Sequence, residues 1–453
     1  MLNRKIELAL LKWKNSGIRK VLILRGARQV GKTSVVRKFG QEHFSDLIEI
    51  NMENREIFEI FDKALSTKQF LERVELVFER KAIPGQTLLF IDEVQSSKNV
   101  MELLRFFAED HPDLHVIVTG SLMEVVMRGK WNVPVGRVEY LNMYPLTFFE
   151  YLEAIDRNAV KKQLLTWRLG ETKGHNLIWR ELFEEYLQVG GMPEAVINFK
   201  SNHSYSELAQ IHSRLSESYQ DDIVKYVSKD KEASTVRMVL GYAPRIAGQM
   251  FTYENMGQSG LPSRNVSEAV AKVALARLLY QVPSINSTNL PITIKFKRPK
   301  KMIWCDIGLS NAQNKISVPL LQGTYSGQMM EQVVGQTLIA DFEHEKPGLY
   351  YWGRDHNEGS AEVDFVMQRN QQLVAFEVKA GNSREMKSLF SMMDLGGDDV
   401  VPVRISWDEP GIETYEYASK KYKVYKIPFY LLERWQELVP PSLLFSHRQT
   451  GQL

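Results

Sequence analysis

Residues 21–39 read VLILRGARQVGKTSVVRKF, and this stretch decides the fold of the N-terminal part of the chain. VLIL is a short apolar run typical of a buried parallel strand, and TSVVRKF has the spacing of a helix. Between the two, Gly26 to Thr33 fit the pattern G-x-x-x-x-G-K-[ST]. The two glycines let the backbone curl so that its N–H groups point at phosphate oxygens. The sequence therefore predicts a phosphate-binding loop, the P-loop, between a strand and a helix.

The residues of the P-loop have expected roles in binding ATP and Mg²⁺. Lys32 is expected to reach the β- and γ-phosphates, and the Thr33 hydroxyl to bind Mg²⁺. The N-terminus of the helix adds its partial positive charge. A chance match to the pattern is the alternative, and the strand and helix at its two ends argue against it. The expected nucleotide-binding residues are Gly26, Ala27, Arg28, Gln29, Val30, Gly31, Lys32, Thr33 and Ser34.

A second segment, TLLFIDEVQ (87–95), is an apolar strand that ends in two carboxylates. We expect Asp92 to hold Mg²⁺, and Glu93 to orient and deprotonate the water that attacks ATP. A lone Asp-Glu pair after a strand is also a common helix cap. The P-loop, about 60 residues upstream, favours the catalytic interpretation.

Two further segments supply candidates for the γ-phosphate. The strand HVIVTGSL (115–122) ends in polar residues, and Thr119 or Ser121 is expected to hydrogen-bond the γ-phosphate or the attacking water. Small polar residues also close strands for structural reasons alone. Arg137 is a candidate arginine finger, acting in cis or from a neighbouring subunit of a homo-oligomer. A surface arginine without a role in catalysis is the alternative.

Length and composition bound the remaining possibilities. A chain of 453 residues is too long for one core, so two or three domains are expected. The formal net charge of +2 provides no global field for nucleic acid or membranes. The single cysteine, Cys305, excludes disulfides within the chain and a cysteine-based zinc site. No stretch approaches about 18 uninterrupted apolar residues, and the charged N-terminus lacks a signal peptide's apolar core. A cytoplasmic protein with no membrane contact is expected.

The middle of the chain changes to helical spacing from about residue 145. Near its end, a helix (235–249), a turn-rich break and a second helix (263–282) precede ITIKFKRPKKMIWC (292–305), which is expected to form strand, basic turn and strand. This order suggests a winged helix. KFKRPKK (295–301) has five basic residues in seven and would suit a wing against DNA phosphates. A solvated hairpin tip, or a module that contacts protein, is the alternative.

The stretch EVDFVMQRNQQLVAFEVKA (362–380) is an expected hairpin that carries charges inside apolar strands. Residues two apart in a strand share a face, so Glu377 and Lys379 point the same way, and the hairpin brings Asp364 beside them. Paired carboxylates need a cation, and oxygen ligands suit Mg²⁺. Lys379 would then position or activate a water, as in a nuclease, and Glu331 is a further ligand. A salt bridge on a partly exposed sheet face is the alternative.

The order of these motifs resembles a known family. LRGARQVGKTS, FIDEVQ, VTGSL and GRVEYLNMYPLTFFEYL resemble the prokaryotic AAA-type ATPases related to the archaeal ATPase group. YLQVGGMPEAV, CDIGLSNA, EVDFVMQ and AFEVKAG resemble the C-terminal module usually fused to them, a domain of unknown function whose end is similar to the PD-(D/E)XK, or restriction-endonuclease-like, fold. One departure is Val363, which stands where that motif's name has Pro. The resemblance implies nucleotide roles for Gly31, Lys32, Thr33, Asp92 and Glu93, and nuclease-motif positions for Glu331, Asp364, Glu377 and Lys379.

We therefore expect an α/β protein of three modules. Residues 1–150 form a P-loop ATPase domain with a parallel sheet, 151–305 a helical and winged-helix region, and 306–453 a restriction-endonuclease-like domain. The expected function is Mg²⁺-dependent ATP hydrolysis, with the last domain acting on DNA and cutting a phosphodiester. The alternatives are an ATP-driven switch whose last domain binds nucleic acid or a protein without cutting, and ATPase activity alone.

Overall fold

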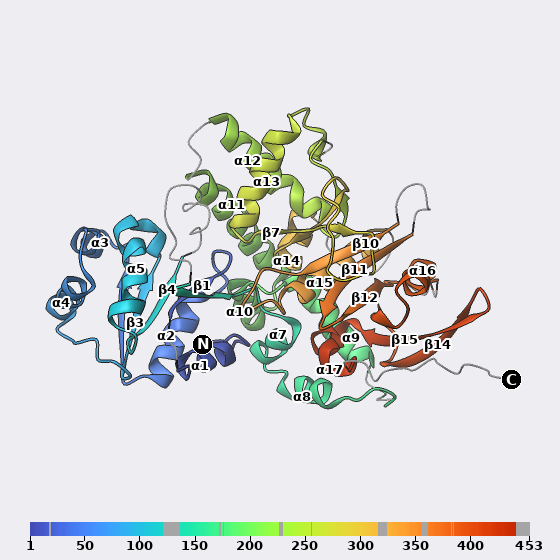
Figure 1. The fold of residues 1–453 in the computed structure, drawn as a ribbon, viewed down its shortest axis with the longest axis horizontal. Coiled ribbons are helices and arrows are strands. Elements are labelled where there is room, and N and C mark those ends of the chain that lie inside the picture. Colours follow the sequence, from blue (N-terminus) through green and yellow to red (C-terminus); the bar gives the residue numbers. More distant parts are fainter. Residues whose placement is uncertain are drawn as a thin grey trace.

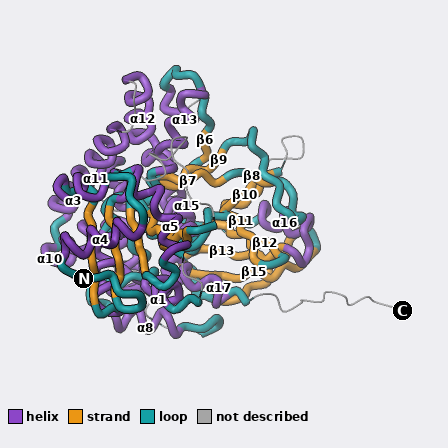
Figure 2. The backbone as a smooth tube through the Cα atoms, turned by 60° about the vertical axis from the view of Figure 1, so that its left-hand side comes forward, coloured by secondary structure: helices purple, strands orange, loops and turns teal. Residues whose placement is uncertain are grey.

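The fold was obtained as a computed structural model. Two larger sheets lie towards opposite ends of the molecule, and helices α11, α12 and α13 stand above them (Figures 1 and 2). Among the described residues, no helix is long and apolar enough to cross a membrane. The structure describes residues 1–17, 20–120, 136–171, 174, 176–225, 230–254, 256–315, 324–354, 361–381, 383 and 385–440.

The N-terminal sheet has five parallel strands in the order β2-β3-β4-β1-β5. Strands β3 and β4 are buried along their whole length, as expected for apolar runs covered by helices on both faces. The strands are β1 (Val21–Arg25), β2 (Asp46–Asn51), β3 (Thr87–Asp92), β4 (His115–Thr119) and β5 (Val138–Asn142). The helices are α1 (Glu7–Lys14), α2 (Lys32–His43), α3 (Arg55–Phe61), α4 (Thr67–Phe78), the 3-10 turn η1 (Val94–Ser96) and α5 (Lys98–Asp110).

The middle region is helical and ends in a small sheet. Its three antiparallel strands are β6 (Met250–Phe251), β9 (Lys300–Trp304) and β7 (Leu279–Val282), with β9 in the centre. The helices are α7 (Phe148–Ala154), α8 (Asn158–Thr166), α9 (Asn176–Val189), α10 (Pro193–Asn202), α11 (Tyr205–Lys225), α12 (Asp230–Tyr242), η2 (Ala243–Ile246), η3 (Met256–Gln258), α13 (Ser263–Leu275) and α14 (Ile307–Gln313).

One expected strand of this region is wrong. The partner of β9 is β7, which was expected to be the end of the preceding helix, and no strand begins at residue 292. Helix α13 ends at Leu275, and Arg277 then adopts a left-handed conformation with φ 61°. Leu279 and Val282 of β7 are both buried, so the apolar residues that suggested a longer helix pack as a short strand instead.

The C-terminal sheet has seven strands in the order β14-β15-β13-β12-β11-β10-β8. The expected hairpin is present as β11 and β12, which pair antiparallel with Phe365 opposite Phe376, whereas β12 and β13 are parallel. The strands are β8 (Ser284–Ile285), β10 (Leu349–Gly353), β11 (Glu362–Arg369), β12 (Gln372–Val378), β13 (Val400–Ser406), β14 (Gly411–Tyr417) and β15 (Lys420–Pro428). The helices are α15 (Thr324–Ile339), α16 (Lys387–Gly396), η4 (Gly397–Asp399), η5 (Phe429–Arg434) and α17 (Trp435–Leu438).

The three parts share one apolar core, which runs from one face of the five-stranded sheet through the helices to one face of the C-terminal sheet. Polar contacts close the same joint. The Asn142 N–H, at the end of β5, donates to Glu343 O at 2.6 Å, and the Asn142 side chain donates to the carbonyls of Phe342 and Glu345. Buried Asp306 accepts from the N–H groups of Gly191 and Leu309. The nucleotide loop is thus built into a molecule whose parts are firmly joined.

Candidate functional site

The P-loop connects the end of β1 to the start of α2, and its two glycines are needed for different reasons. Gly31 caps α2 with φ 97°, a left-handed conformation that glycine adopts without strain. Gly26 has ordinary dihedrals, but a Cβ there would lie 2.3 Å from the carbonyl oxygen of Met143. One glycine therefore allows the turn, and the other allows the close approach of a neighbouring chain segment.

Lys32 is buried at the base of this loop with only 6% of its surface exposed. Its Nζ donates to the backbone carbonyls of Gly26 at 3.0 Å and Ala27 at 2.9 Å. Burial lowers the pKa of Lys32 to about 8, while the nearby charges of Glu93 and Asp92 act in the opposite direction. Within the described part of the chain Lys32 forms no ion pair, so an incoming phosphate would meet a cation that no carboxylate has neutralised.

Asp92 gathers the groups expected around Mg²⁺. The Thr33 hydroxyl donates to Asp92 Oδ2 at 2.8 Å, and the Thr119 hydroxyl donates to Asp92 Oδ1. The carboxylate lies at the end of β3 and is only 4% exposed. A hydroxyl and a carboxylate are hard oxygen donors of the kind Mg²⁺ takes beside nucleotide phosphates. The residues present therefore fit the expected ion.

Glu93 follows directly, in a left-handed conformation with φ 51°. Its backbone N–H donates to Asp92 Oδ1 at 3.0 Å, and Gln95 Nε2 donates to its side chain. Because it stands at the carboxyl end of β3, on the edge of the sheet where the P-loop begins, its position suits a group that acts on water near the γ-phosphate.

Two neighbours from helix α11 reach the P-loop. The Arg28 guanidinium forms an ion pair with Asp222, and the Tyr219 hydroxyl donates to Arg28 O at 3.0 Å. The other expected loop residues differ in exposure. Ala27 and Val30 are buried, whereas Gln29, with φ 64°, and Ser34 are exposed. The loop therefore touches the middle region through Arg28.

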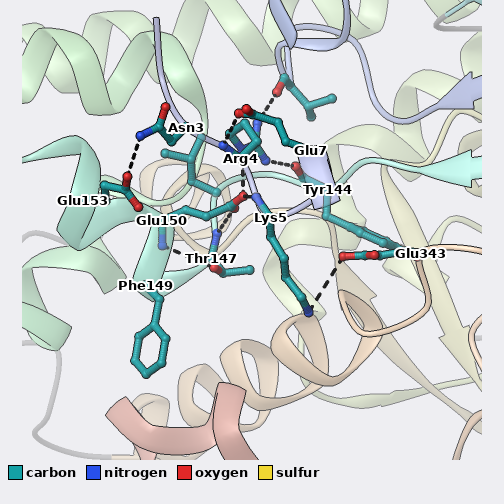
Figure 3. A network of polar contacts seen from close by, with 12 residues as sticks. Asn3, Arg4, Lys5, Glu7, Tyr144, Thr147, Phe149, Glu150, Glu153 and Glu343 are labelled. Atoms are coloured by element: carbon teal, nitrogen blue, oxygen red, sulfur yellow. Dashed lines mark hydrogen bonds and ion pairs between the residues drawn. The ribbon is translucent and has the colours of Figure 1, made fainter. Parts of the chain in front are cut away.

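Arg4, from the segment before α1, braces the P-loop from its other side (Figure 3). The buried guanidinium donates to Val30 O at 2.8 Å and to Tyr144 O at 2.7 Å, and it pairs with Glu150 at 3.0 Å. The same Glu150 carboxylate accepts from the N–H of Lys5 at 2.6 Å and closes the capping box of α7. A carbonyl of the loop is thus fixed by a residue far from it in sequence.

Lys5 points the other way, towards the C-terminal part of the chain (Figure 3). Its Nζ lies 3.4 Å from Asp341 and 3.9 Å from Glu343, which both follow α15. Arg4 and Lys5 therefore connect the P-loop and the C-terminal domain through adjacent residues.

The hairpin charges meet in the C-terminal domain as a carboxylate cluster, which we define as Glu331, Glu362, Asp364 and Glu377. The cation in its midst is Lys301 of β9, which is 1% exposed. Lys301 Nζ lies 2.6 Å from Glu331 Oε2, 3.4 Å from Asp364 Oδ1 and 3.9 Å from Glu362 Oε1. Burial by itself lowers the pKa of Lys301, but the carboxylates outweigh it and hold that pKa above its ordinary value.

The expected neighbours of Asp364 are also in place. Asp364 Oδ2 accepts from the Val378 N–H at 2.7 Å, and Lys379 Nζ donates to Glu377 Oε1 at 2.7 Å. The other oxygen of Glu377 is buried and accepts no hydrogen bond from the described residues. Burial, together with the charge of Asp364, raises the pKa of Glu377 to about 8 and that of Glu331 to about 7.

The structure also bears on whether this carboxylate cluster could hold the expected metal ion. The described residues contain no group of three or more His, Cys, Asp or Glu side chains arranged to hold a metal ion. The binding of a divalent ion by Glu331, Asp364 and Glu377 stays a prediction, and in this arrangement the cation beside Glu331 and Asp364 is Lys301. The expectation for Thr33 and Asp92 is unaffected, since nucleotide phosphates would supply the further ligands there.

Comparison with protein families identifies the first part of the chain. Residues 18–152 match a family model described as an AAA domain. This region is an AAA domain of the P-loop ATPase class. Residues 180–319 and 326–428 match two models described as domains of unknown function (DUF8612 and DUF4143). The expected AAA-type ATPase is thus confirmed, while the two other matches name no activity.

Similar solved structures share little sequence with this chain. A Walker-type ATPase of Pyrococcus abyssi is 15% identical, covers 69% of this chain and 96% of its own, and has a TM-score of 0.41. The Holliday junction branch migration motor RuvB of Thermotoga maritima is 16% identical with 70% and 94% covered and a TM-score of 0.31. The ORC1 protein of Aeropyrum pernix, solved in complex with DNA, is 12% identical with 70% and 93% covered and a TM-score of 0.30. Likeness at this level carries no argument about function. No curated protein matches the chain.

Arg137 of the AAA domain does not reach the P-loop of its own chain. Val138 pairs with Val21 and Asn142 with Arg25 in the parallel β5 and β1, so Arg137 stands at the amino end of the strands and the P-loop at the carboxyl end. Five residues of strand separate these edges by about 15 Å. Arg137 instead pairs with Glu109 at 3.0 Å and is 58% exposed. In this structure Arg137 therefore stands away from the P-loop of its own chain, and the arginine finger, in cis or in trans, stays a prediction. Ser121, the alternative to Thr119, lies outside the described residues.

The basic segment 295–301 is less exposed than expected. Arg298 donates to the carbonyl of Gly353 at 2.7 Å, and Lys300 donates to the Tyr253 hydroxyl at 2.7 Å. With Lys301 buried in the carboxylate cluster, three of the five basic residues bind groups within the chain. Lys297 is the exposed basic residue of the segment.

Sequence reasoning missed four of these contact residues. Tyr219 and Asp222 lie on α11 and Arg4 in the segment before α1, and the local pattern of these segments says nothing about a loop elsewhere in the chain. Lys301 did carry a signal, because it directly precedes Met302, Ile303 and Trp304, all of them buried. A lysine that opens a buried strand needs an internal partner, as Asp364 does.

Proposed function

We propose that this protein is an Mg²⁺-dependent ATPase that uses Lys32, Thr33, Asp92 and Glu93 of its AAA domain. The observation that carries the proposal is the meeting of the Thr33 and Thr119 hydroxyls on buried Asp92, beside a lysine held only by backbone carbonyls. These residues come from three different parallel strands or the loops after them, at the one edge of the sheet where nucleotides bind in such folds.

Each of these residues has its own role in binding or hydrolysing ATP. Lys32 binds the β- and γ-phosphates, and the backbone N–H groups after Gly31 cradle them. Thr33 and Asp92 would hold Mg²⁺, which neutralises phosphate charge when it is bound. Thr119 orients the Asp92 carboxylate. Glu93 accepts a proton from the attacking water.

Replacing Glu93 by Gln tests this assignment, because the amide keeps the shape of the side chain but cannot accept the proton. We expect Glu93→Gln to bind ATP as the wild type does and to hydrolyse it at least about 10²-fold more slowly. Fluorescent-nucleotide binding and phosphate release measure the two steps separately. Lys68→Ala, an exposed change on α4, is the matched control and should leave both unchanged. Wild-type turnover in Glu93→Gln would remove Glu93 from the mechanism.

A second proposal concerns the parts after the AAA domain. We infer that α12, β6, α13, β7 and β9 form a winged helix, since β6 lies between the two helices in sequence and pairs with β9, which β7 flanks on its other side. We also infer a restriction-endonuclease-like fold for the last domain. A helix with Glu331, an antiparallel meander with Asp364 and Glu377, a helix and a parallel strand follow one another there.

We propose that these parts bind DNA and that the AAA domain controls this binding as an ATP-driven switch. The switch without cutting is favoured over cutting because Lys301 occupies the carboxylate cluster. Anisotropy with labelled single- and double-stranded DNA, with and without ATP, should show binding that salt weakens. Lys297→Ala should weaken binding on all sequences, since an exposed lysine contacts phosphate rather than bases. Absence of salt-sensitive binding would instead indicate a protein partner.

A further inference from the structure

Lys301 reaches the carboxylate cluster from a different sheet, and its position bears on which cation balances the carboxylates. Lys301 belongs to the small sheet, where Met250 of β6 and Val282 of β7 flank it on either side. Its backbone is therefore held from both edges of the central strand. The side chain crosses from this sheet into the C-terminal domain, where the ammonium lies 4.8 Å from the centre of the Phe365 ring. A cation from one module is thus fixed inside another.

Four of the six carboxylate oxygens of Glu331, Asp364 and Glu377 already have a partner. Asp364 gives one oxygen to Lys301 and the other to the Val378 N–H, and Glu331 gives Oε2 to Lys301. Glu377 gives Oε1 to Lys379. Glu377 Oε2 is the one buried oxygen of these three residues that lacks a hydrogen-bond partner in the described part of the chain. A divalent ion takes about six oxygen ligands, so an ion in this cluster would have to displace some of these contacts.

The charges of the cluster are already partly balanced. Two ammonium groups, Lys301 and Lys379, lie against the four carboxylates, so two negative charges remain when all of these groups are ionised. Adding a divalent cation beside a buried lysine places like charges together in a low-dielectric setting, which is unfavourable. A metal ion would therefore have to compete with Lys301 for these carboxylates.

We propose that Lys301 is the resident counter-ion of the carboxylate cluster, and that the native protein holds no divalent ion there. Lys301 does the electrostatic work of a metal but cannot polarise a water as a metal does. The C-terminal domain then has the form of a nuclease without its metal-dependent chemistry. Lys301 also joins the small sheet to α15 and β11. The inference needs neither DNA as a partner nor a working ATPase.

Binding of Mn²⁺ to the nucleotide-free protein tests the proposal. Electron paramagnetic resonance counts bound ions, and an Asp92→Asn background removes the nucleotide site from the count. In this background we expect the number of bound Mn²⁺ ions per chain to stay the same when Asp364→Asn is added. Lys301→Met in the same background should gain one Mn²⁺ per chain, because the freed carboxylate oxygens then require a cation. Adding Asp364→Asn to Lys301→Met should abolish the extra Mn²⁺ ion. Lys301→Arg keeps the positive charge, so it should bind no extra Mn²⁺.

Two results would overturn the proposal. The first is Mn²⁺ bound to the Asp92→Asn protein and lost with Asp364→Asn, which would place a metal beside Lys301. This comparison leaves Lys301 in place, so it decides the matter even where Lys301→Met does not fold. The second is a Lys301→Met protein with a native circular dichroism spectrum and no gain of Mn²⁺. Loss of ATP hydrolysis or DNA binding is measured separately and bears on neither result.

Discussion

Two buried lysines of this protein meet opposite surroundings. Lys32 is held by the carbonyls of Gly26 and Ala27, and burial lowers its pKa to about 8. Lys301 is equally enclosed, but Glu331 and Asp364 lie against its ammonium and keep its pKa above the ordinary value. Within the described residues, the first lysine has no carboxylate in ion-pair contact, although Asp92 and Glu93 lie near it, and the second is paired with carboxylates.

The difference shows what makes a buried charge available to a ligand. A charge buried without a counter-ion costs free energy, and a ligand of opposite charge recovers that cost on binding. A charge buried with its counter-ions gains nothing from such a ligand. The P-loop is therefore open to phosphate, whereas we propose that the carboxylate cluster is closed to metal, although both sites consist of charged groups at the ends or edges of a sheet.

The largest effect on stability is expected from removing Lys301, the cation of the carboxylate cluster. Lys301→Met leaves the partly buried carboxylates of Glu331 and Asp364 without this counter-ion, so we expect the free energy of unfolding to fall by about 3 kcal/mol. Urea titration followed by fluorescence measures the change. Lys297→Met, an exposed change in the same segment, is the control and should be nearly silent. An equal stability of both variants would mean that the cluster does not depend on Lys301.

Removing Lys32, the cation of the P-loop, should affect catalysis instead. Lys32→Ala deletes the side chain expected to bind the β- and γ-phosphates, so ATP hydrolysis should fall on the order of 10²–10³-fold. Phosphate release measures the rate, with Lys68→Ala as the control. A Lys32→Ala protein that hydrolyses ATP normally would show that the P-loop is not the working site.

The stability of the nucleotide-free protein should respond to the two lysines with opposite signs. Because burial lowers the pKa of Lys32 to about 8, the folded protein binds this proton more weakly than the unfolded chain does. Lys32→Met should therefore stabilise the protein by about 1–3 kcal/mol near pH 7. This gain should shrink as the pH rises from about 8 towards 10.5, since the wild-type lysine then loses its charge. Urea titrations at several pH values test both statements, and a destabilised Lys32→Met would contradict them.

Arg4 holds the P-loop in place without reaching the reacting groups. It fixes Val30 O and Tyr144 O with separate nitrogens, and lysine cannot reproduce that fork. Arg4→Lys should raise the KM for ATP about 5–10-fold and change kcat by less than about twofold, because it disturbs the loop and not the reacting groups. Asn3→Ala, which removes a neighbouring contact to Glu153, is the matched control. A fall in kcat with unchanged KM would exclude a positioning role for Arg4.

The smallest effect is expected at the contact between the P-loop and α11. Arg28 is partly exposed, so its ion pair with Asp222 contributes less than about 1 kcal/mol. Asp222→Asn should change the KM for ATP by about twofold or less. A much larger change in the same assay would make α11 part of the nucleotide site.

Several features could be predicted because they depend on neighbours in sequence. The P-loop, the β3 carboxylates and the hairpin parity of Glu377 and Lys379 follow from motif spacing and from the period of a strand. The boundaries of the small sheet could not, because an apolar stretch such as 278–282 suits a helix and a strand alike. Arg137 was misplaced for a related reason, since a motif does not say at which end of its strand a residue stands.

The sequence alone determined the nucleotide loop and the presence of charged residues in the last sheet. The loop is eight consecutive residues whose backbone geometry is local, so its chemistry can be read from order and spacing. Only the tertiary structure decided what neutralises the carboxylates. Lys301 is 63 positions from Asp364 and belongs to another sheet, and its basic neighbours in sequence suggested a surface turn. Whether a charge is solvated or buried depends on which elements pack over it, and no local periodicity specifies that.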